Sequence, residues 1–182
     1  KEESTVVPVK EEKKSGIGSF LIVALVIGGV IGAGYYFKVV KAKEDRMLED
    51  FEEDDGGFVS GIESGTANDW EWGIPTSGPN GAASGEKLWA TNLDGVYSRG
   101  YDAYIESPAI VLPENGTAVL TFTHWYDFDG TTTLWDYGQV LISNDDGATW
   151  VNITPTPEGK YGRRVQQWFI EEIPLTGYEG DT

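Results

Sequence analysis

The segment 17–37 constrains the fold of this chain more than any other feature. It reads IGSFLIVALVIGGVIGAGYYF and contains no charged residue. As a helix, with a rise of about 1.5 Å per residue, it would cross a hydrocarbon core about 30 Å thick. The aromatic residues 35–37 at its end, followed by Lys38, suit a membrane interface. The run therefore predicts one transmembrane helix within residues 16–40.

Two other interpretations of this segment are weaker. The apolar core of a secretory signal is shorter, about 7–15 residues, and no A-x-A-like cleavage site follows. A buried helix of a soluble protein would rarely contain five glycines. Gly28 and Gly32 form a G-x-x-x-G pattern, which on a membrane helix lets two helices approach closely. They are the candidate residues for self-association through helix pairing.

The flanks of the apolar run are polar. Residues 1–15 contain four Lys and four Glu and are predicted to be a disordered tail. Residues 41–57 are predicted to form a charged juxtamembrane stalk. Four basic residues lie on each side of the run, so the positive-inside rule does not fix the orientation. The character of the domain that follows favours a single-pass cell-membrane protein with an extracellular globular domain.

Composition excludes several classes of protein. The net charge is −17, and from Gly57 onward 18 acidic residues face five basic ones. Such a surface repels phosphate backbones, which argues against a nucleic-acid partner. The chain has no Cys, so disulfides and Cys-based zinc sites are excluded.

Residues 58–182 have the pattern of an all-β sandwich, in which short apolar or alternating stretches are separated by Gly, Pro, Asn and Asp. Leu120, Phe122, His124 and Tyr126 would share one face of a strand. The expected strands are residues 103–111, 118–126, 137–143, 150–153 and 165–173, with 137–143 and 150–153 forming a hairpin.

Four runs in this region resemble a known family: DWEWGIPTSGP at 69–79, SGEKLWAT at 84–91, YIESP at 104–108 and LTFTHWY at 120–126. Together they are similar to prokaryotic MAM-like jelly-roll domains, concanavalin A-like modules appended to secreted peptidases such as the immune inhibitor A group. The resemblance implies a jelly-roll fold with a binding or spacer role. It also implies further strands after residue 182, and hence a domain truncated at its C-terminus.

The run 143–150 fits the pattern S-x-D-x-G-x-T-W of the Asp-box of sialidases. Asp145 can accept backbone N–H groups, Gly147 can take a positive φ, and Trp150 can pack beneath the hairpin. Ser143, Asp145, Gly147 and Trp150 are therefore predicted to form a structural turn rather than an active site.

Two sets of side chains are candidates for ligand binding. Asp127, Asp129 and Asp136 could supply oxygen ligands to a structural calcium ion, although a solvated acidic turn explains them equally well. A second set, the aromatic one, could stack on the sugar rings of surface glycans, or could simply fill the core. Its members are Trp70, Trp72, Trp125 and Trp135.

Catalysis is not expected. His124 is the one His in the chain, no G-x-S-x-G elbow is present, and no spacing singles out a carboxylate pair. The sequence thus predicts a membrane-anchored, non-catalytic domain for adhesion or for recognition of surface glycans or proteins. Two alternatives are an accessory domain of a larger secreted or surface peptidase and a subunit of a self-assembling surface filament or layer.

Overall fold

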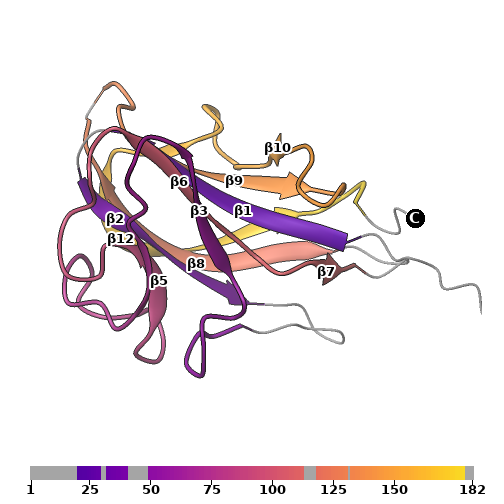
Figure 1. Ribbon diagram of the computed structural model, residues 1–182, viewed down its shortest axis with the longest axis horizontal. Coiled ribbons are helices and arrows are strands. Elements are labelled where there is room, and N and C mark those ends of the chain that lie inside the picture. The colour runs from indigo at the N-terminus through magenta and orange to yellow at the C-terminus, as the bar shows by residue number, and fades with distance from the viewer. Residues whose placement is uncertain (1–19, 30–31, 41–48, 113–117, 131, 179–182) are drawn as a thin grey trace, which may run out of the picture.

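The computed structural model describes residues 20–29, 32–40, 49–112, 118–130 and 132–178. These residues form strands and connecting turns without a helix. The strands build two sheets that lie against each other as a sandwich (Figure 1). The prediction of an all-β sandwich is therefore confirmed at the level of fold class.

The first sheet has seven strands among the described residues, with the order β10-β9-β1-β6-β3. β11 also pairs with β9, and β7 pairs with β1. The strands of this sheet are β1 (Phe20–Gly29), β3 (Val59–Ser64), β6 (Tyr101–Glu106), β7 (Ile110–Val111), β9 (Tyr137–Ser143), β10 (Val151–Asn152) and β11 (Tyr161–Gly162).

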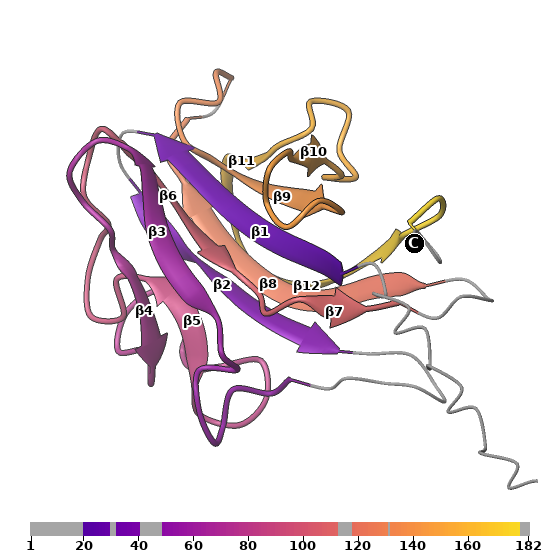
Figure 2. The same ribbon diagram turned by 45° about the vertical axis from the view of Figure 1, so that its right-hand side comes forward.

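The second sheet has five strands in the order β12-β8-β2-β5-β4. They are β2 (Gly32–Val40), β4 (Trp70–Gly73), β5 (Leu88–Thr91), β8 (Val119–Phe128) and β12 (Arg164–Pro174). Every pairing in both sheets is antiparallel. Figure 2 shows the two layers, with β1 in one and β2 in the other.

The main core lies between the sheets and is rich in aromatic residues. Phe122 and Phe128 of β8 face Val140 and Ile142 of β9, and all four side chains are fully buried. A smaller cluster lies on the outer face of the five-stranded sheet, where Leu88, Ala90 and Trp125 are buried. Both faces of this sheet therefore carry buried side chains.

The strands expected from alternation are confirmed. Residues 118–126, 137–143 and 165–173 correspond to β8, β9 and β12, and residues 150–153 return as β10, which pairs with β9. The stretch 103–111 is divided into β6 and β7 around Pro108, because proline cannot donate a ladder hydrogen bond. In β8, Leu120, Phe122 and His124 are buried on one face, as the period of two requires.

The helix expected over residues 17–37 was wrong for the part of this segment that the structure describes. β1 lies between β6 and β9, and β2 lies between β5 and β8. A continuous apolar run shows no alternation, so periodicity alone cannot distinguish a strand from a helix. The β-branched and aromatic residues of this segment suit such strands.

The expected helix-pairing face is also absent. Gly28 belongs to β1 and pairs with Asp102 and Tyr137, whereas Gly32 belongs to β2 and pairs with Phe128. The two glycines therefore lie in different sheets and share no helical face. Among the described residues, no helix has the length and apolar character needed to cross a membrane.

Candidate ligand-binding groove

A groove of about 670 Å³ lies over the outer face of the five-stranded sheet, where β8 and β12 meet a loop between β4 and β5. The loop contributes residues 78–82, including Asn80, and the strands contribute the remaining lining residues, Trp125, Asp127, Gln166, Gln167 and Trp168. A volume of this size is typical of small-molecule sites, and its mixture of aromatic and polar groups is also typical.

The aromatic part of the groove is a cross-strand pair. Trp168 of β12 lies opposite Trp125 of β8 in the register of the sheet. Trp125 is only 6% exposed, and Trp168 is half-buried and packs against the small cluster that contains Trp125. Aromatic pairs at such positions stabilise a sheet. Here the pair also gives the groove a rigid aromatic wall.

The polar part of the groove is produced by a β-bulge in β12. Arg164 pairs with Asp127, and the next pair is Trp168 with Trp125. β12 therefore contains three residues opposite the single residue of β8 between these pairs. Bulges redirect side chains and occur often beside functional sites. This bulge places Gln166 and Gln167 at the groove.

The backbone of the bulge is strained. Arg163 has a φ of 74° and Gln166 a φ of 51°. Residues other than glycine rarely adopt the left-handed region, and the cost is of the order of 1 kcal/mol each. The strained conformation persists because regular pairing on both sides of the bulge holds it in place.

Asp127 links the bulge to β8. Gln166 Nε2 donates a hydrogen bond of 2.6 Å to Asp127 Oδ2. Asp127 Oδ1 is buried without a hydrogen bond, and Arg164 Nε lies 3.8 Å from it. A buried acceptor that lacks a hydrogen bond costs about 1–3 kcal/mol. Buried polar groups without a hydrogen bond are unusual in folded proteins.

The loop that borders the groove is held by hydrogen bonds to backbone carbonyl groups. Thr76 N and Ser77 N donate to Leu93 O at 2.7 and 3.1 Å, and Ser77 Oγ lies 3.1 Å from Gly95 O. Gly78, with a φ of 72°, then turns the chain toward the groove in a conformation that favours glycine. The loop is thus anchored before it reaches Asn80.

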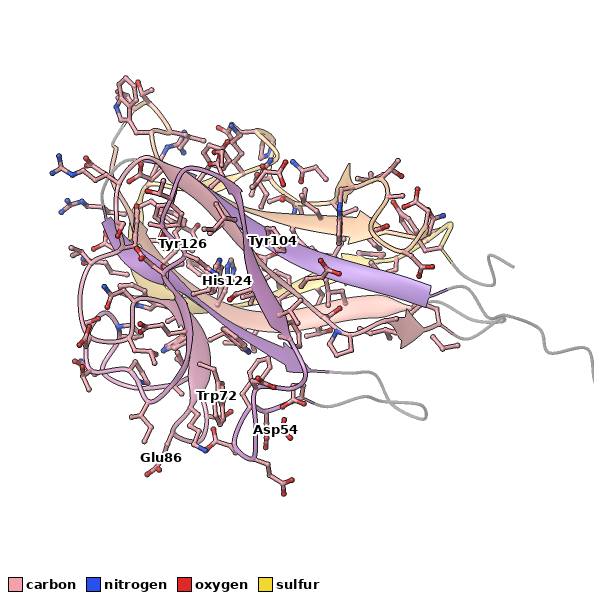
Figure 3. All side chains as sticks on the ribbon, viewed as in Figure 1. Asp54, Trp72, Glu86, Tyr104, His124 and Tyr126 are labelled. Carbon is pink, nitrogen blue, oxygen red and sulfur yellow. The ribbon has the colours of Figure 1, made fainter. Side chains whose placement is uncertain are left out.

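The four tryptophans proposed as ligand contacts do not gather at one place. Trp125 alone among them lines the groove. Trp70 is buried in the main core, and Trp135 is 62% exposed. Trp72 donates from Nε1 to Phe51 O at 2.9 Å and lies under Lys87, far from His124 at the centre of the sandwich (Figure 3).

The three aspartates proposed as calcium ligands each have a different environment. Asp136 is fully buried and accepts a hydrogen bond of 2.6 Å from the Tyr97 hydroxyl. Burial, followed by the neighbouring Asp136, raises the pKa of that hydroxyl. Asp129 Oδ1 accepts from Gly130 N at 2.8 Å, and Asp127 belongs to the groove. Within the described ranges, no group of three or more His, Asp or Glu side chains is placed to hold a metal ion.

The Asp-box has the geometry of a structural turn. Asp145 accepts from Thr149 N at 2.8 Å and from Thr149 Oγ1 at 2.6 Å, and Ser143 Oγ donates to it at 2.8 Å. Gly147 has a φ of 79°, and its backbone lies close to the Trp150 ring. These hydrogen bonds, chiefly those from Thr149, lower the pKa of Asp145.

His124 is enclosed between the sheets rather than placed at a surface. It is 1% exposed and surrounded by aromatic rings, with the ring centroid of Tyr161 4.5 Å away. Burial lowers the pKa of His124, and Glu171, whose Oε1 lies 3.7 Å from Nε2, opposes this shift only in part. A substrate could not reach this imidazole.

A second cavity, of about 510 Å³, lies on the seven-stranded sheet. It is lined by Tyr104 and Trp150 together with three acidic residues, Glu63, Glu106 and Asp146. Its acidic lining distinguishes it from the groove, where Asp127 is the one charged lining residue.

The chain is similar to part of a known peptidase. A region of Bacillopeptidase F from Bacillus subtilis (strain 168) is 38% identical over 154 residues. The match covers 84% of this chain and 10% of the peptidase. No family model matches the chain, and no solved structure matches it. The MAM-like assignment therefore stays a prediction.

Sequence reasoning missed most of the groove. It identified Trp125 and Asp127 but assigned them to different sites, and it overlooked Gln166, Gln167 and Trp168. Pairing the predicted strands 118–126 and 165–173 would have brought Trp125 and Trp168 onto neighbouring strands. The bulge has no sequence signal, because neither Arg163 nor Gln166 is a residue expected at positive φ.

Proposed function

We propose that this chain is a non-catalytic accessory domain of a larger secreted or surface peptidase, and that the groove on its five-stranded sheet is its recognition site. The similarity to one tenth of Bacillopeptidase F carries this proposal. A segment of that size, folded as a β-sandwich, corresponds to an appended module rather than to a whole enzyme.

The arrangement of the described side chains supports a non-catalytic role. Acid–base catalysis by histidine requires an imidazole within hydrogen-bond reach of the substrate, and His124 is enclosed in the core. Asp136 is also buried, and its carboxylate already accepts a hydrogen bond from the Tyr97 hydroxyl. The groove offers amide and indole groups, which bind and orient a ligand, and one carboxylate, Asp127, which already accepts from Gln166 and lies 3.8 Å from Arg164 Nε.

Recognition, the first of the functions expected from the sequence, fits within this proposal. An accessory domain that binds a surface polymer would hold the catalytic part of a peptidase near its substrates. The membrane tether is not part of the proposal, because the described residues of the apolar run form strands. Assembly into a filament and an extracellular location stay predictions.

The complete reading frame and one activity assay test this proposal. We expect the same open reading frame to encode a peptidase catalytic domain, and we expect the purified 182-residue chain to leave fluorescently labelled casein intact. A reading frame without any peptidase domain would contradict the accessory role. Casein hydrolysis that persists after repurification would contradict the non-catalytic role.

A further inference from the structure

Resting on the proposed role as a recognition domain, we propose that the groove binds a neutral saccharide. In this assignment a sugar ring packs its C–H face against Trp168, the cross-strand neighbour of Trp125. Its hydroxyl groups exchange hydrogen bonds with Gln166, Gln167 and Asn80. The argument rests on the aromatic pair, the polar groups, the charge and the volume of the groove.

The aromatic pair provides a flat apolar surface of fixed orientation. Trp125 is buried by its neighbours on the sheet, and Trp168, its partner on the adjacent strand, packs against the same cluster. Indole combines a large apolar face with one N–H donor, and few side-chain rotamers must be fixed when it binds. The C–H face of a pyranose ring is the complementary apolar surface on a polar molecule.

The polar groups of the groove match hydroxyls. Each hydroxyl is one donor and two acceptors, and each Gln or Asn amide offers both two N–H donors and an acceptor oxygen. Three such amides, from Asn80, Gln166 and Gln167, line the groove beside the indoles. A hydrocarbon ligand would cover these amides without offering them hydrogen bonds, which disfavours a lipid.

Charge favours a neutral ligand. Among the lining residues that the structure describes, Asp127 is the single charged one and none is Lys or Arg; the nearby Arg164 has its Nε 3.8 Å from Asp127 Oδ1. The chain as a whole carries a net charge of −17. An anionic sugar, phosphate or sulfate would therefore be repelled, and no basic side chain of the lining would compensate.

The volume favours an oligosaccharide. About 670 Å³ is in the range of sites that enclose drug-sized molecules, of about 300–1,000 Å³, and far exceeds the space that a metal ion needs. The groove lies on a sheet face and is bounded on one side by the anchored loop, which suits a chain of sugar rings laid along β8 and β12.

Isothermal titration of the full chain with neutral trisaccharides tests the proposal. The probes are chitotriose, cellotriose and maltotriose, with trigalacturonate as the anionic comparison and casein peptides as the alternative class. We expect at least one neutral trisaccharide to bind with a Kd below about 1 mM, and trigalacturonate to bind at least about tenfold more weakly. Binding of peptides alone, or of no trisaccharide, would overturn the proposal.

Matched variants locate the binding site. Trp168→Ala should weaken trisaccharide binding by about tenfold or more, whereas Trp135→Ala, at an exposed tryptophan outside the groove, should leave it within about twofold. Asp127→Asn keeps both tryptophans but weakens the hydrogen bond that holds the Gln166 amide at the groove, so it should weaken binding, unlike Asp94→Asn at an exposed bend. Far-UV circular dichroism checks that each variant is folded.

Equal losses of trisaccharide affinity in Trp168→Ala and Trp135→Ala would mean that the sugar binds outside the groove, and would overturn the assignment. If Trp168→Ala fails to fold, Asp127→Asn decides alone, and unchanged binding in that variant overturns the assignment. The reading-frame test is independent of these titrations. If the reading frame encodes a peptidase domain but the chain binds no saccharide, the accessory role stands and the saccharide proposal is overturned.

Discussion

At the scale of single residues, His124 makes stability depend on pH. Burial lowers its pKa below the unfolded value of 6.5, so the folded protein holds it neutral while the unfolded chain protonates it as the pH falls. The unfolded state then binds more protons, and the free energy of unfolding decreases below about pH 6.5. His124 is therefore an acid-sensitive group in the interior of the sandwich.

Replacing His124 by phenylalanine removes this group and keeps an aromatic ring among the neighbouring rings. Between pH 7.5 and 5.5 we expect the native chain to lose about 1 kcal/mol more stability than His124→Phe. Urea unfolding at both pH values measures the difference. Since His124 is the sole histidine in the sequence, parallel pH dependence in the two proteins would contradict its neutral, buried state.

Asp145 has the opposite dependence on pH. Its hydrogen bonds with Thr149 and Ser143 favour the charged form and lower its pKa from 3.8. Its contribution to stability is therefore present above about pH 4 and is lost as the pH falls through the folded pKa.

Substitution of Asp145 tests the structural role of the Asp-box. Asp145→Asn should destabilise the chain at pH 7, and the deficit should shrink at pH 3, where the native carboxylate is increasingly protonated. Asp146→Asn, on an adjacent exposed residue, is the control and should have little effect. Urea midpoints at both pH values provide the measurement, and equal effects of the two substitutions would argue against the turn.

At the scale of elements, the bulge in β12 shapes the groove, and we expect the sheet to form without it. Removal of Gln166 and Gln167 would leave one residue between Arg164 and Trp168, matching the single residue between Asp127 and Trp125. Because two residues are removed, every later side chain keeps its face of the sheet. The strained φ of Gln166 would also disappear.

We therefore expect the double deletion Gln166–Gln167 to retain the fold and to lose trisaccharide binding by about tenfold or more. Thermal unfolding and titration of the same preparation check both parts. An unfolded product would show that the bulge is required by the sheet. Deleting Gln167 alone, which reverses the faces of the residues on one side, is the contrasting variant and should be destabilising.

The central position of β1 can be tested through its backbone. Ala24 pairs with Glu106 on one side and with Leu141 on the other. Proline at this position removes a backbone donor inside the sheet, so Ala24→Pro should cost about 3 kcal/mol or more. Val59→Pro, at the first residue of the outer strand β3, should cost much less.

Urea unfolding followed by circular dichroism compares the two proline variants. Similar stabilities for Ala24→Pro and Val59→Pro would mean that residues 20–29 are not a central strand. A helical far-UV spectrum of the native chain in aqueous buffer would also contradict the strand assignment, since the described residues contain no helix.

Prediction from sequence succeeded where one physical signal was sufficient. Alternation identified β8, β9 and β12, because each has one face in the core and another toward solvent or the groove. It failed for β1 and β2, because a long uncharged run fits a membrane helix and a buried strand pair equally. It also failed for the groove, which depends on pairing between distant strands and on a bulge that composition does not specify.

At the scale of the whole molecule, the excess of negative charge opposes folding. With a net charge of −17, the compact state brings like charges together. Salt screens this repulsion over about 10 Å at 0.1 M, so added salt should favour the folded state.

We expect the midpoint of thermal unfolding to rise by a few degrees between 10 and 200 mM NaCl, measured by differential scanning calorimetry, because about 1 kcal/mol moves the midpoint of a chain of this size by about 2–4 °C. KCl should act like NaCl. CaCl2 at matched ionic strength tests the calcium prediction: a further rise that Asp127→Asn or Asp129→Asn removes would support bound calcium. An unchanged midpoint in all three salts would contradict the role of repulsion.

The central places of β1 and β2 also set the order in which the chain can fold during its synthesis. Among the described strands, the ribosome releases β1 and β2 before their partners, and β8 and β9, one neighbour of each, follow about a hundred residues later. At about 5–20 residues per second, the wait is roughly 5–20 s. During this wait the most apolar segment of the chain has at most part of its final pairing, because β5 and β6 are synthesised before β8 and β9. A nascent chain paused before β8 is therefore the form most exposed to aggregation, and the one that should most need a chaperone.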